Sequence, residues 1–308
     1  MIGRRWSPTL GVLAIAACVG CTPTLDDRPW SISRLTIVGW KAEPPEVAPG
    51  TTVALEALAI DPAAAVDPSA TAWTLCHTPK PPSENRVVAP DCLAPAAVPD
   101  AVGDPASIAI PSDVCTVFGP DVPQPLPGQP TARARDSDAT GGYFQPVTVV
   151  LGGAVAIGLE RVTCDLPDAS LADARAFRAA YRANQNPSIT GLAFASDDGS
   201  RIDPGAVPAG AHLVVQASWL PGGIETFPVF DRQSRTIVST AETLQASWYV
   251  TGGLLDRPAT TITDPAATTT STGWIAPGGA ATVQLALVVR DSRGGSDLAR
   301  ATLVIAGP

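Results

Sequence analysis

The chain offers only two histidines as candidate general bases, and neither lies in a recognisable catalytic motif. His77 follows a cysteine at the predicted end of a strand, whereas His212 alternates with apolar residues and is expected to face solvent. A Ser-His-Asp triad would need one of them beside a serine and an acid. There is also no Gly-x-Ser-x-Gly elbow and no glycine-rich phosphate loop followed by lysine. A two-carboxylate glycosidase has no local motif, and no pair stands out among the 29 acidic residues. We therefore predict no catalytic residues and no enzyme activity.

Carboxylates gather in two predicted loops, where a hard cation such as calcium could find oxygen ligands. The first loop holds Asp197, Asp198 and Asp203 around a glycine, and the second holds Asp291 and Asp297. Neither loop has the spacing of an EF-hand. Aspartate and glycine are also the residues that turns need for conformational reasons. We predict no metal site and no cofactor, and we keep bound calcium as the alternative.

Four of the six cysteines belong to the body of the chain: Cys76, Cys92, Cys115 and Cys164. An even number of cysteines in an exported protein predicts disulfides, here two. Four cysteines allow three connectivities, and the sequence does not choose among them. We favour Cys76–Cys92 with Cys115–Cys164, because the first pair would close a short loop. A zinc site is the less favoured alternative, because zinc ligands normally come in close pairs.

The N-terminus has the features of a secretion signal. Arg4 and Arg5 precede an apolar stretch, residues 10–17, which is shorter than the roughly 20 residues that cross a bilayer as a helix. It ends in Ile15-Ala16-Ala17-Cys18, which resembles the lipobox of bacterial lipoproteins, and Cys21 is the alternative acylated cysteine. We predict a lipoprotein signal peptide over residues 1–21, cleaved before Cys18 or Cys21, and a tether over residues 22–31. An ordinary secretory signal is the alternative.

The lipobox resemblance also implies a location. Acyl chains such as palmitate would fix the protein to a membrane. Neither Val19 nor Thr22, the residues after the two candidate cysteines, is the aspartate that keeps some lipoproteins at the inner membrane. We therefore expect a lipid-anchored protein of the cell outer membrane, periplasmic or surface-exposed.

Charge excludes one class of partner. The net charge is -9, and the only lysines are Lys41 and Lys80, so the clustered cations that bind nucleic acid are missing. No apolar run after the signal is long enough to span a membrane. The longest, residues 147–159, is divided by Gly152 and Gly153 and predicts a β-hairpin.

Two parts of the chain share one pattern, in which two alternating strands flank a proline-glycine turn. The first copy comprises residues 34–38, 48–50 and 52–58, and the second comprises 188–194, 207–210 and 212–217. Each copy continues into a strand with a central tryptophan, Trp73 or Trp248, and closes with a hairpin or long strand. A buried tryptophan on a central strand is typical of immunoglobulin-like sandwiches. The repeat predicts an all-β fold with two tandem immunoglobulin-like β-sandwich domains.

We place the first sandwich at residues 32–166 and the second at 188–308. The first carries a surplus at about residues 79–138, which is rich in proline and holds Cys92 and Cys115. Proline cannot donate to a sheet ladder, so we expect this insertion to be mostly irregular loop.

A connector helix is predicted between the sandwiches, at residues 167–187. Ser170 and Asp173 resemble a capping box, and Pro187 is expected to end the helix. Residues at helical spacing include Leu171, Ala174, Phe177 and Tyr181. We expect Phe177 and Tyr181 to pack against a sandwich.

Exposed aromatic rings could bind sugars by stacking. Trp219 continues an inward-facing alternation and is expected in the core, which leaves Trp40 and Trp274 as possible ligand-facing rings. Aromatics are only 5% of the residues, and two sandwich cores need most of them. A polysaccharide-binding surface module is therefore the alternative function.

Several short motifs resemble those of a group of bacterial surface lipoproteins of unknown function. Besides the lipobox, they are residues 43–45 with 49–50, 73–76, 143–146, 184–187, 247–249 and 290–295. These motifs are turns and core positions, so the resemblance implies a fold and an anchor but no catalytic residue. It implies a membrane-anchored, extracytoplasmic module with a structural or protein-interaction role in the cell envelope. The expected partners are the membrane, through the acyl chains, and an envelope protein or glycan.

Overall fold

The structure is a computed structural model that describes residues 28–78, 88–121, 127, 140–166 and 169–307. The signal peptide and both candidate acylation sites, Cys18 and Cys21, lie outside the described residues. No helix within the described ranges is long and apolar enough to cross a membrane.

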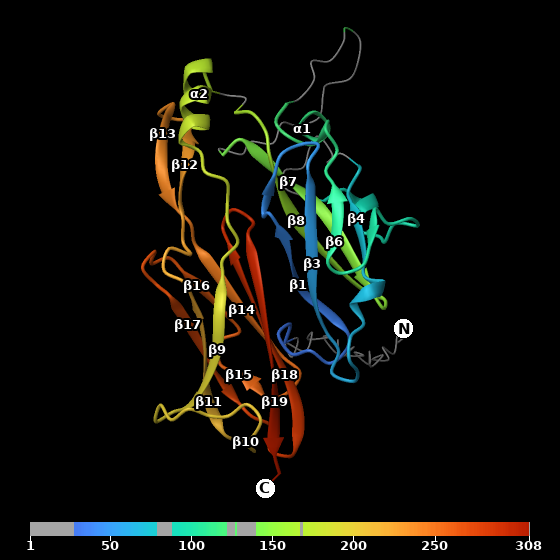
Figure 1. The fold of residues 1–308 in the computed structure, drawn as a ribbon, viewed down its shortest axis with the longest axis vertical. Helices are drawn as coiled ribbons and strands as arrows, with labels where there is room; N and C mark the ends of the chain where they lie inside the picture. The colour runs from blue at the N-terminus through green and yellow to red at the C-terminus, as the bar shows by residue number, and fades with distance from the viewer. Residues whose placement is uncertain (1–27, 79–87, 122–126, 128–139, 167–168, 308) are drawn as a thin grey trace, which may run out of the picture.

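The first part of the chain forms a β-sandwich of two sheets (Figure 1). Its outer sheet has the order β2-β8-β7-β4-β5, and its inner sheet has the order β1-β3-β6. The outer strands are β2 Glu46–Val47, β8 Ala154–Thr163, β7 Gly142–Leu151, β4 Ala72–Leu75 and β5 Ala101–Val102. The inner strands are β1 Thr36–Glu43, β3 Thr52–Ile60 and β6 Ala106–Ala109. Within the described residues, this sandwich also includes three short helical segments: η1 Pro68–Ala70, η2 Pro90–Cys92 and α1 Val114–Val117.

The second sandwich follows the same plan. Its inner sheet has the order β10-β19-β18-β14-β16, and its outer sheet has the order β15-β17-β11-β9. The inner strands are β10 Val207–Pro208, β19 Ser296–Ala306, β18 Ala281–Asp291, β14 Leu244–Val250 and β16 Ala259–Ile262. The outer strands are β15 Leu254–Leu255, β17 Thr269–Ile275, β11 His212–Trp219 and β9 Ile189–Ser196. A separate hairpin, β12 Thr226–Asp231 with β13 Thr236–Ala241, extends beyond the sandwich.

The two sandwiches correspond strand by strand, which confirms the predicted repeat. A two-residue strand pairs in parallel with the last long strand in both: β2 with β8, and β10 with β19. The tryptophan strand pairs with the penultimate long strand in both, β4 with β7 and β14 with β18. Both tryptophans, Trp73 and Trp248, are fully buried. The chain is therefore all-β, with two tandem immunoglobulin-like sandwiches.

The proline-rich insertion is less irregular than expected. Within residues 79–138, β6 pairs with β3 and β5 pairs with β4, so both strands belong to the first sandwich. The apolar side chains of Ala106 and Ile108 point into the core, and the residues between them face outward. Four alternating residues among prolines are too short a pattern to predict a strand, so the sequence did not indicate β6; outside its short strands and helical segments, the described part of the insertion is irregular.

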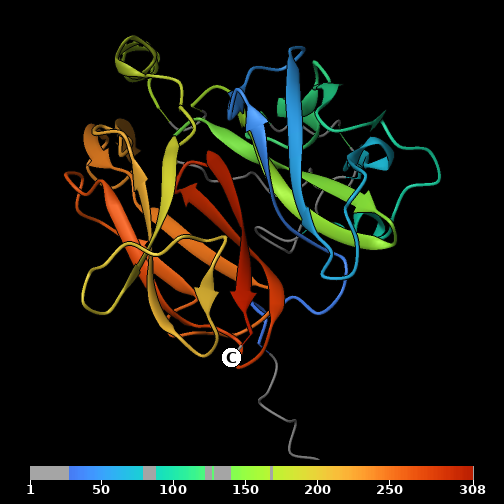
Figure 2. The ribbon, with the colours of Figure 1, turned by 60° about the horizontal axis from the view of Figure 1, so that its bottom comes forward.

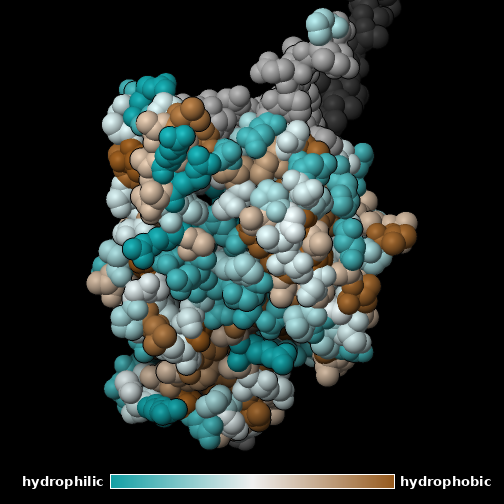
Figure 3. Space-filling model, turned by 45° about the horizontal axis from the view of Figure 1, so that its top comes forward, coloured by the Kyte–Doolittle hydropathy of each residue, from teal (hydrophilic) through white to brown (hydrophobic). Residues whose placement is uncertain are grey.

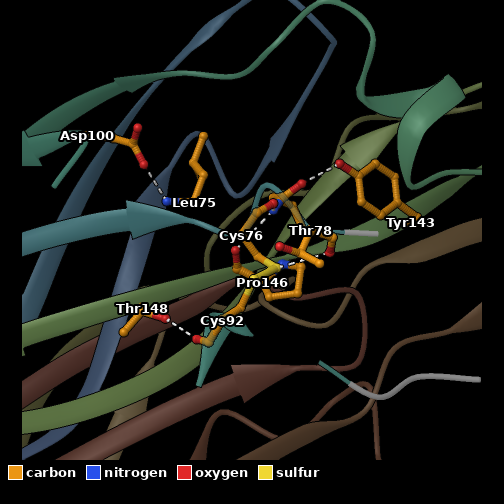
Figure 4. Close-up of a disulfide and its surroundings, with 9 residues drawn as sticks. Leu75, Cys76, Thr78, Cys92, Asp100, Tyr143, Pro146 and Thr148 are labelled. Atoms are coloured by element: carbon orange, nitrogen blue, oxygen red, sulfur yellow. Dashed lines mark hydrogen bonds between the residues drawn. A yellow bond between two sulfur atoms is a disulfide. The ribbon is translucent and has the colours of Figure 1, made fainter. Parts of the chain in front are cut away.

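Both favoured disulfides are present and are therefore confirmed. Cys76–Cys92 ties the end of β4 to η2, and Thr148 Oγ1 on β7 donates a hydrogen bond to the Cys92 carbonyl at 3.0 Å (Figure 4). Cys115–Cys164 ties α1 to the end of β8. Each bridge joins an element of the insertion to the outer sheet, so the disulfides hold the irregular segments against the sandwich.

The connector helix is α2, Leu171–Ala180, beside the β12–β13 hairpin (Figure 1). Its cap is as predicted, because the Ser170 side chain accepts from the Asp173 N–H. Phe177 is buried against Leu166 and Phe230, so it packs against the hairpin. The predicted end was wrong: the helix stops well before Pro187, and the next residues run extended into the junction between the sandwiches.

The sandwiches pack against each other through their inner sheets, giving four layers in all (Figure 2). Apolar side chains from β1, β3 and β18 meet between them. This apolar patch consists of Ile32, Val38, Leu58, Ile60, Ala286 and Val288. Strand β18 is therefore buried on both faces, with its alternate residues Leu285 and Leu287 in the core of its own sandwich.

The predicted tether also contacts a sandwich. The Val250 N–H at the end of β14 donates to the Trp30 carbonyl at 2.9 Å, and the Ile32 N–H donates to the Val250 carbonyl at 2.8 Å. Residues 28–31 thus lie against the second sandwich, although the chain next enters the first. The described end of the predicted tether is therefore held by backbone hydrogen bonds to the end of β14, on the side that β18 leaves unpaired.

Candidate functional site

The loop between β18 and β19 carries an arginine into the junction between the sandwiches. The Arg293 side chain is only 5% exposed. Its Nη2 donates to Glu46 Oε2 on β2 of the first sandwich at 3.0 Å, and Nη1 lies 3.4 Å from Glu242 Oε1 of the second. Nη2 also donates to the Tyr181 hydroxyl at 3.0 Å, and that hydroxyl donates to Glu46. One guanidinium therefore joins both sandwiches and the segment that follows α2.

Asp291 shapes the loop that presents this arginine. Its Oδ1 accepts from the N–H groups of Arg293 and Gly295, both at 2.8 Å. Asn184 Nδ2, from the connector, donates to its Oδ2 at 3.1 Å. A Cβ on Gly295 would collide with this carboxylate, so the position requires glycine. Both carboxylate oxygens of Asp291, one of the residues considered as calcium ligands, thus accept hydrogen bonds inside the fold. Within the described residues, no group of three His, Cys, Asp or Glu side chains could hold a metal ion.

The junction holds more acid than base. Besides Arg293, it contains the carboxyls of Glu46, Glu225, Glu242 and Asp291. Burial raises the pKa of Glu242 to about 7, and repulsion from Asp291 adds to this. Burial also raises the pKa of Asp291. The Glu242 carboxyl is therefore partly protonated at neutral pH, which relieves the excess negative charge. We call these five residues the Arg293 cluster.

Glu160 on β8 adds a second buried acid. Burial, followed by repulsion from Glu46, raises the pKa of its carboxyl well above the usual range. Its Oε1 has no hydrogen-bond partner among the described residues. A buried carboxyl without a partner is costly when charged, so burial favours the protonated form of Glu160.

A groove of about 520 Å³ runs beside the cluster, between the two sandwiches. One wall is β8, the floor is β1 with Trp40, and the other wall is the β18–β19 loop from Arg290 to Ser296. Two of the β8 side chains that line it are exposed, Ile157 by 37% and Leu159 by 46%, and Val155, two residues before Ile157 on the same strand, is exposed by 44%. Apolar and polar groups from both sandwiches thus meet in one hollow, the arrangement expected of a ligand site.

Trp40 is the predicted aromatic that the structure places in this groove. Its ring packs edge-on against Trp73 with centroids 6.0 Å apart, and it lies over Gly158, where a Cβ would collide with the indole. The ring is partly exposed, and its Nε1 has no hydrogen-bond partner among the described residues.

Trp274 is not a ligand-facing ring, and that prediction was wrong. The side chain is fully buried, and its Nε1 donates to the Gly252 carbonyl at 3.0 Å. The residue lies on β17, whose even-numbered side chains face the core. Trp219 is buried, as predicted.

The histidines lie apart from the groove. His212 is exposed, as expected, and its Nδ1 lies 2.6 Å from Asp197 Oδ1 while its Nε2 lies 3.3 Å from Asp256 Oδ2. Hydrogen bonds to Asp197 and then Asp256 raise the pKa of this imidazole. His77 lies 3.4 Å from Asp100 on the first sandwich. Neither histidine has a hydrogen bond to a serine within the described part of the chain.

The sequence analysis missed the Arg293 cluster and the groove. The segment 290–295 was expected to include a loop and forms the turn between β18 and β19, yet nothing in its sequence shows that Arg293 points inward. One available signal was the unbroken apolar run 285–289, because a strand without alternation is typical of burial on both faces.

Surface hydropathy does not suggest a competing site at the α2 end of the molecule. Figure 3 shows mainly hydrophilic residues there, with hydrophobic residues in small separate groups. A second hollow, of about 540 Å³, lies between α2 and the Cys115–Cys164 disulfide. It borders ranges that the structure does not describe, so we base the site on the groove beside β8.

Comparison with known proteins assigns no family. No protein-family model matches the chain, and no curated protein matches it in sequence. Among solved structures, a chimeric titin Z1Z2-Z1Z2 tandem is 10% identical, with 89% of this chain and 100% of that chain covered and a TM-score of 0.25. The Yersinia pseudotuberculosis adhesin InvE is 11% identical, with 88% and 60% covered and a TM-score of 0.19. Domains 4 and 5 of the S-layer protein SbsC are 8% identical, with 88% and 100% covered and a TM-score of 0.17. Scores this low transfer no ligand, partner or activity to this chain.

Proposed function

We propose that the protein is a lipid-anchored, extracytoplasmic module that binds another component of the cell envelope and performs no catalysis. The observation that carries this proposal is the groove at the junction of the two sandwiches, where exposed apolar side chains of β8 face polar groups of the second sandwich. The charged and apolar contacts on either side of the groove hold its two walls in a fixed relation. A preformed groove of this kind loses little entropy when a ligand binds.

The anchor is the acylated cysteine, Cys18, with Cys21 as the alternative. The two disulfides support export to an oxidising compartment. Each buried methylene of an acyl chain contributes about 0.8 kcal/mol, so several chains hold a protein firmly at a membrane. We place the protein at the outer membrane. The anchor would confine the groove to that surface and raise its effective concentration for any neighbour.

Metabolic labelling with a fatty-acid analogue tests the anchor. The wild-type protein and the Cys21→Ala variant are expected to incorporate the label, whereas Cys18→Ala is expected to lose it. The reverse pattern would move the anchor to Cys21. Equal labelling of all three proteins, or none, would contradict a lipid on either cysteine.

Crosslinking in intact cells tests the binding role. A photoreactive amino acid at Leu159, beside the groove, is expected to capture a reproducible envelope partner. The same group at Leu171, which is 77% exposed on α2, serves as the matched control. Identical capture from both positions, or none from Leu159, would count against a binding role for the groove.

A polysaccharide-binding module is the second candidate, and Trp40 favours it. The partly exposed ring with its indole N–H could stack on and hydrogen-bond to a sugar. A glycan array with the wild type and Trp40→Phe tests this. Phenylalanine keeps much of the packing against Trp73 but lacks the N–H, so a true sugar site is expected to bind more weakly. An empty array would rule this candidate out for the glycans it displays.

A further inference from the structure

The long strand β8 has an open edge where it borders the groove. It pairs with β7 along its whole length, but on its other side β2 covers only Arg161 and Val162. Residues 154–160 therefore have no strand partner on that side within the described residues. An open edge of this kind is a template for another strand.

The hairpin register shows which groups point to this edge. Leu151 and Ala154 flank the two-residue turn Gly152-Gly153, so they form the first hydrogen-bonded pair of the ladder. Pairs alternate from there, so Val155, Ile157 and Leu159 direct their N–H and C=O groups away from β7. These residues are also the exposed apolar ones. The edge thus offers three donors, three acceptors and three apolar side chains along about 13 Å of strand.

A free cation lies at the opposite wall of the same groove. The guanidinium of Arg290 lies near Gly39 of β1. A Cβ added to Gly39 would come within 3.2 Å of Arg290 Nη2. Its guanidinium has no ion pair and no hydrogen bond among the described residues. The two N–H groups of a guanidinium match the two oxygens of a carboxylate. A ligand that fits this groove should therefore carry a negative group near Arg290.

We propose that the groove binds an extended peptide segment of a partner protein, which adds a strand to the edge of β8 and places a carboxylate on Arg290. The proposal rests on the binding role given above and names the class of partner. Backbone hydrogen bonds to Val155, Ile157 and Leu159 supply affinity, and alternate apolar side chains of the peptide pack against theirs. The carboxylate is an aspartate, a glutamate or the C-terminus of the segment.

Strand addition, and not merely an apolar contact, follows from the geometry. A sugar or lipid could use the apolar side chains, but only an extended backbone matches donors and acceptors that repeat at every second residue.

A random library of eight-residue peptides with free C-termini, selected against the full-length acylated protein in detergent, tests the proposal. Enriched peptides are expected to alternate apolar residues and to carry an acidic group near one end. The strongest peptide is then measured against variants. Ile157→Pro removes only the outward N–H, at an edge position that tolerates proline, and is expected to weaken binding about tenfold. Ile157→Val keeps the N–H and is the matched control, with near wild-type affinity.

The charge requirement is tested in the same way. Arg290→Gln is expected to weaken binding of the acidic peptide about tenfold and to leave its amide counterpart unchanged. Equal effects on both peptides would overturn the role of Arg290.

Amide hydrogen exchange on the wild-type protein keeps the proposal testable if Ile157→Pro does not fold. The N–H groups of Val155, Ile157 and Leu159 are expected to exchange quickly in the free protein and to become protected by the peptide. Absence of enriched peptides, or protection elsewhere only, would overturn strand addition. If crosslinking at Leu159 still captured a partner, the binding role would survive and only the extended-peptide class would fall.

Discussion

The two ends of the interface between the sandwiches are built from opposite kinds of side chain. At one end, the patch between β1, β3 and β18 consists of buried apolar side chains. At the other end, the Arg293 cluster buries one guanidinium among several carboxyls. Apolar contacts stabilise without a preferred direction, whereas the guanidinium has to meet Glu46 and Glu242 in one geometry. The difference indicates that the patch supplies adhesion and the cluster sets the relative position of the sandwiches.

Removing the arginine is expected to cause the largest loss of stability at this interface. Arg293→Met would leave Glu46 and Glu242 buried without a cation, and we expect it to lower the free energy of unfolding by about 3–5 kcal/mol. Urea unfolding of the purified protein measures this. Adding Glu46→Gln to the same chain should restore part of the loss. Arg178→Met, at an exposed ion pair with Asp165, is the control and should cost under about 1 kcal/mol. Equal losses in the two variants would contradict a special role for the cluster.

The apolar patch should respond to truncation but not to pH. Val288→Ala removes two methyl groups from the patch, and we expect a loss of about 2 kcal/mol, the same at pH 5 and pH 8. Val304→Ala, at a position 45% exposed, is the matched control and should change stability little. A loss that grows or shrinks with pH would mean that the patch and the cluster are coupled.

The cluster should respond to pH. The pKa of Glu242 is raised in the folded protein to about 7, from an ordinary value of 4.5. Its stabilising contribution is fully present below the unfolded pKa and is lost as the pH rises through the folded pKa. Unfolding free energy should therefore fall by roughly 2 kcal/mol between pH 5 and pH 8. Because His212 changes in the same direction, the measure is the difference between the wild type and Glu242→Gln. Parallel pH profiles for the two proteins would show that Glu242 does not titrate in this range.

The smallest effect is expected at the boundary between the two ends. Lys41 Nζ lies 3.5 Å from Asp297 Oδ1 and 3.5 Å from Glu56 Oε2, and its side chain is partly solvated. Such pairs contribute little, so Lys41→Ala should cost about 0.5 kcal/mol at low salt and less at high salt. Thermal unfolding at two salt concentrations measures this. A loss as large as that of Val288→Ala would place Lys41 among the principal contacts.

Local patterns predicted most of the fold because their causes lie close together in sequence. Gly152 and Gly153 both have positive φ, as a two-residue hairpin turn requires, so the turn between β7 and β8 follows from two residues. Ser170 caps α2 through its neighbour Asp173 for the same reason. The tryptophans of β4 and β14 are buried because strand alternation turns them inward. Local reasoning failed where the pattern was short, at β6, and where it was ambiguous, at Trp274, and it placed the end of α2 too late, at Pro187.

The sequence by itself determined two all-β sandwiches, their repeat and the helix between them, because strand alternation, turns and caps depend on near neighbours. It also supplied the four cysteines that form the two disulfides. The tertiary structure alone decided how the sandwiches meet. Arg293 lies 247 residues from Glu46 along the chain, and no local pattern encodes a contact between side chains so far apart. The open edge of β8 was decided in the same way, because whether a strand lies at the edge of a sheet depends on which other strands of the chain pair with it.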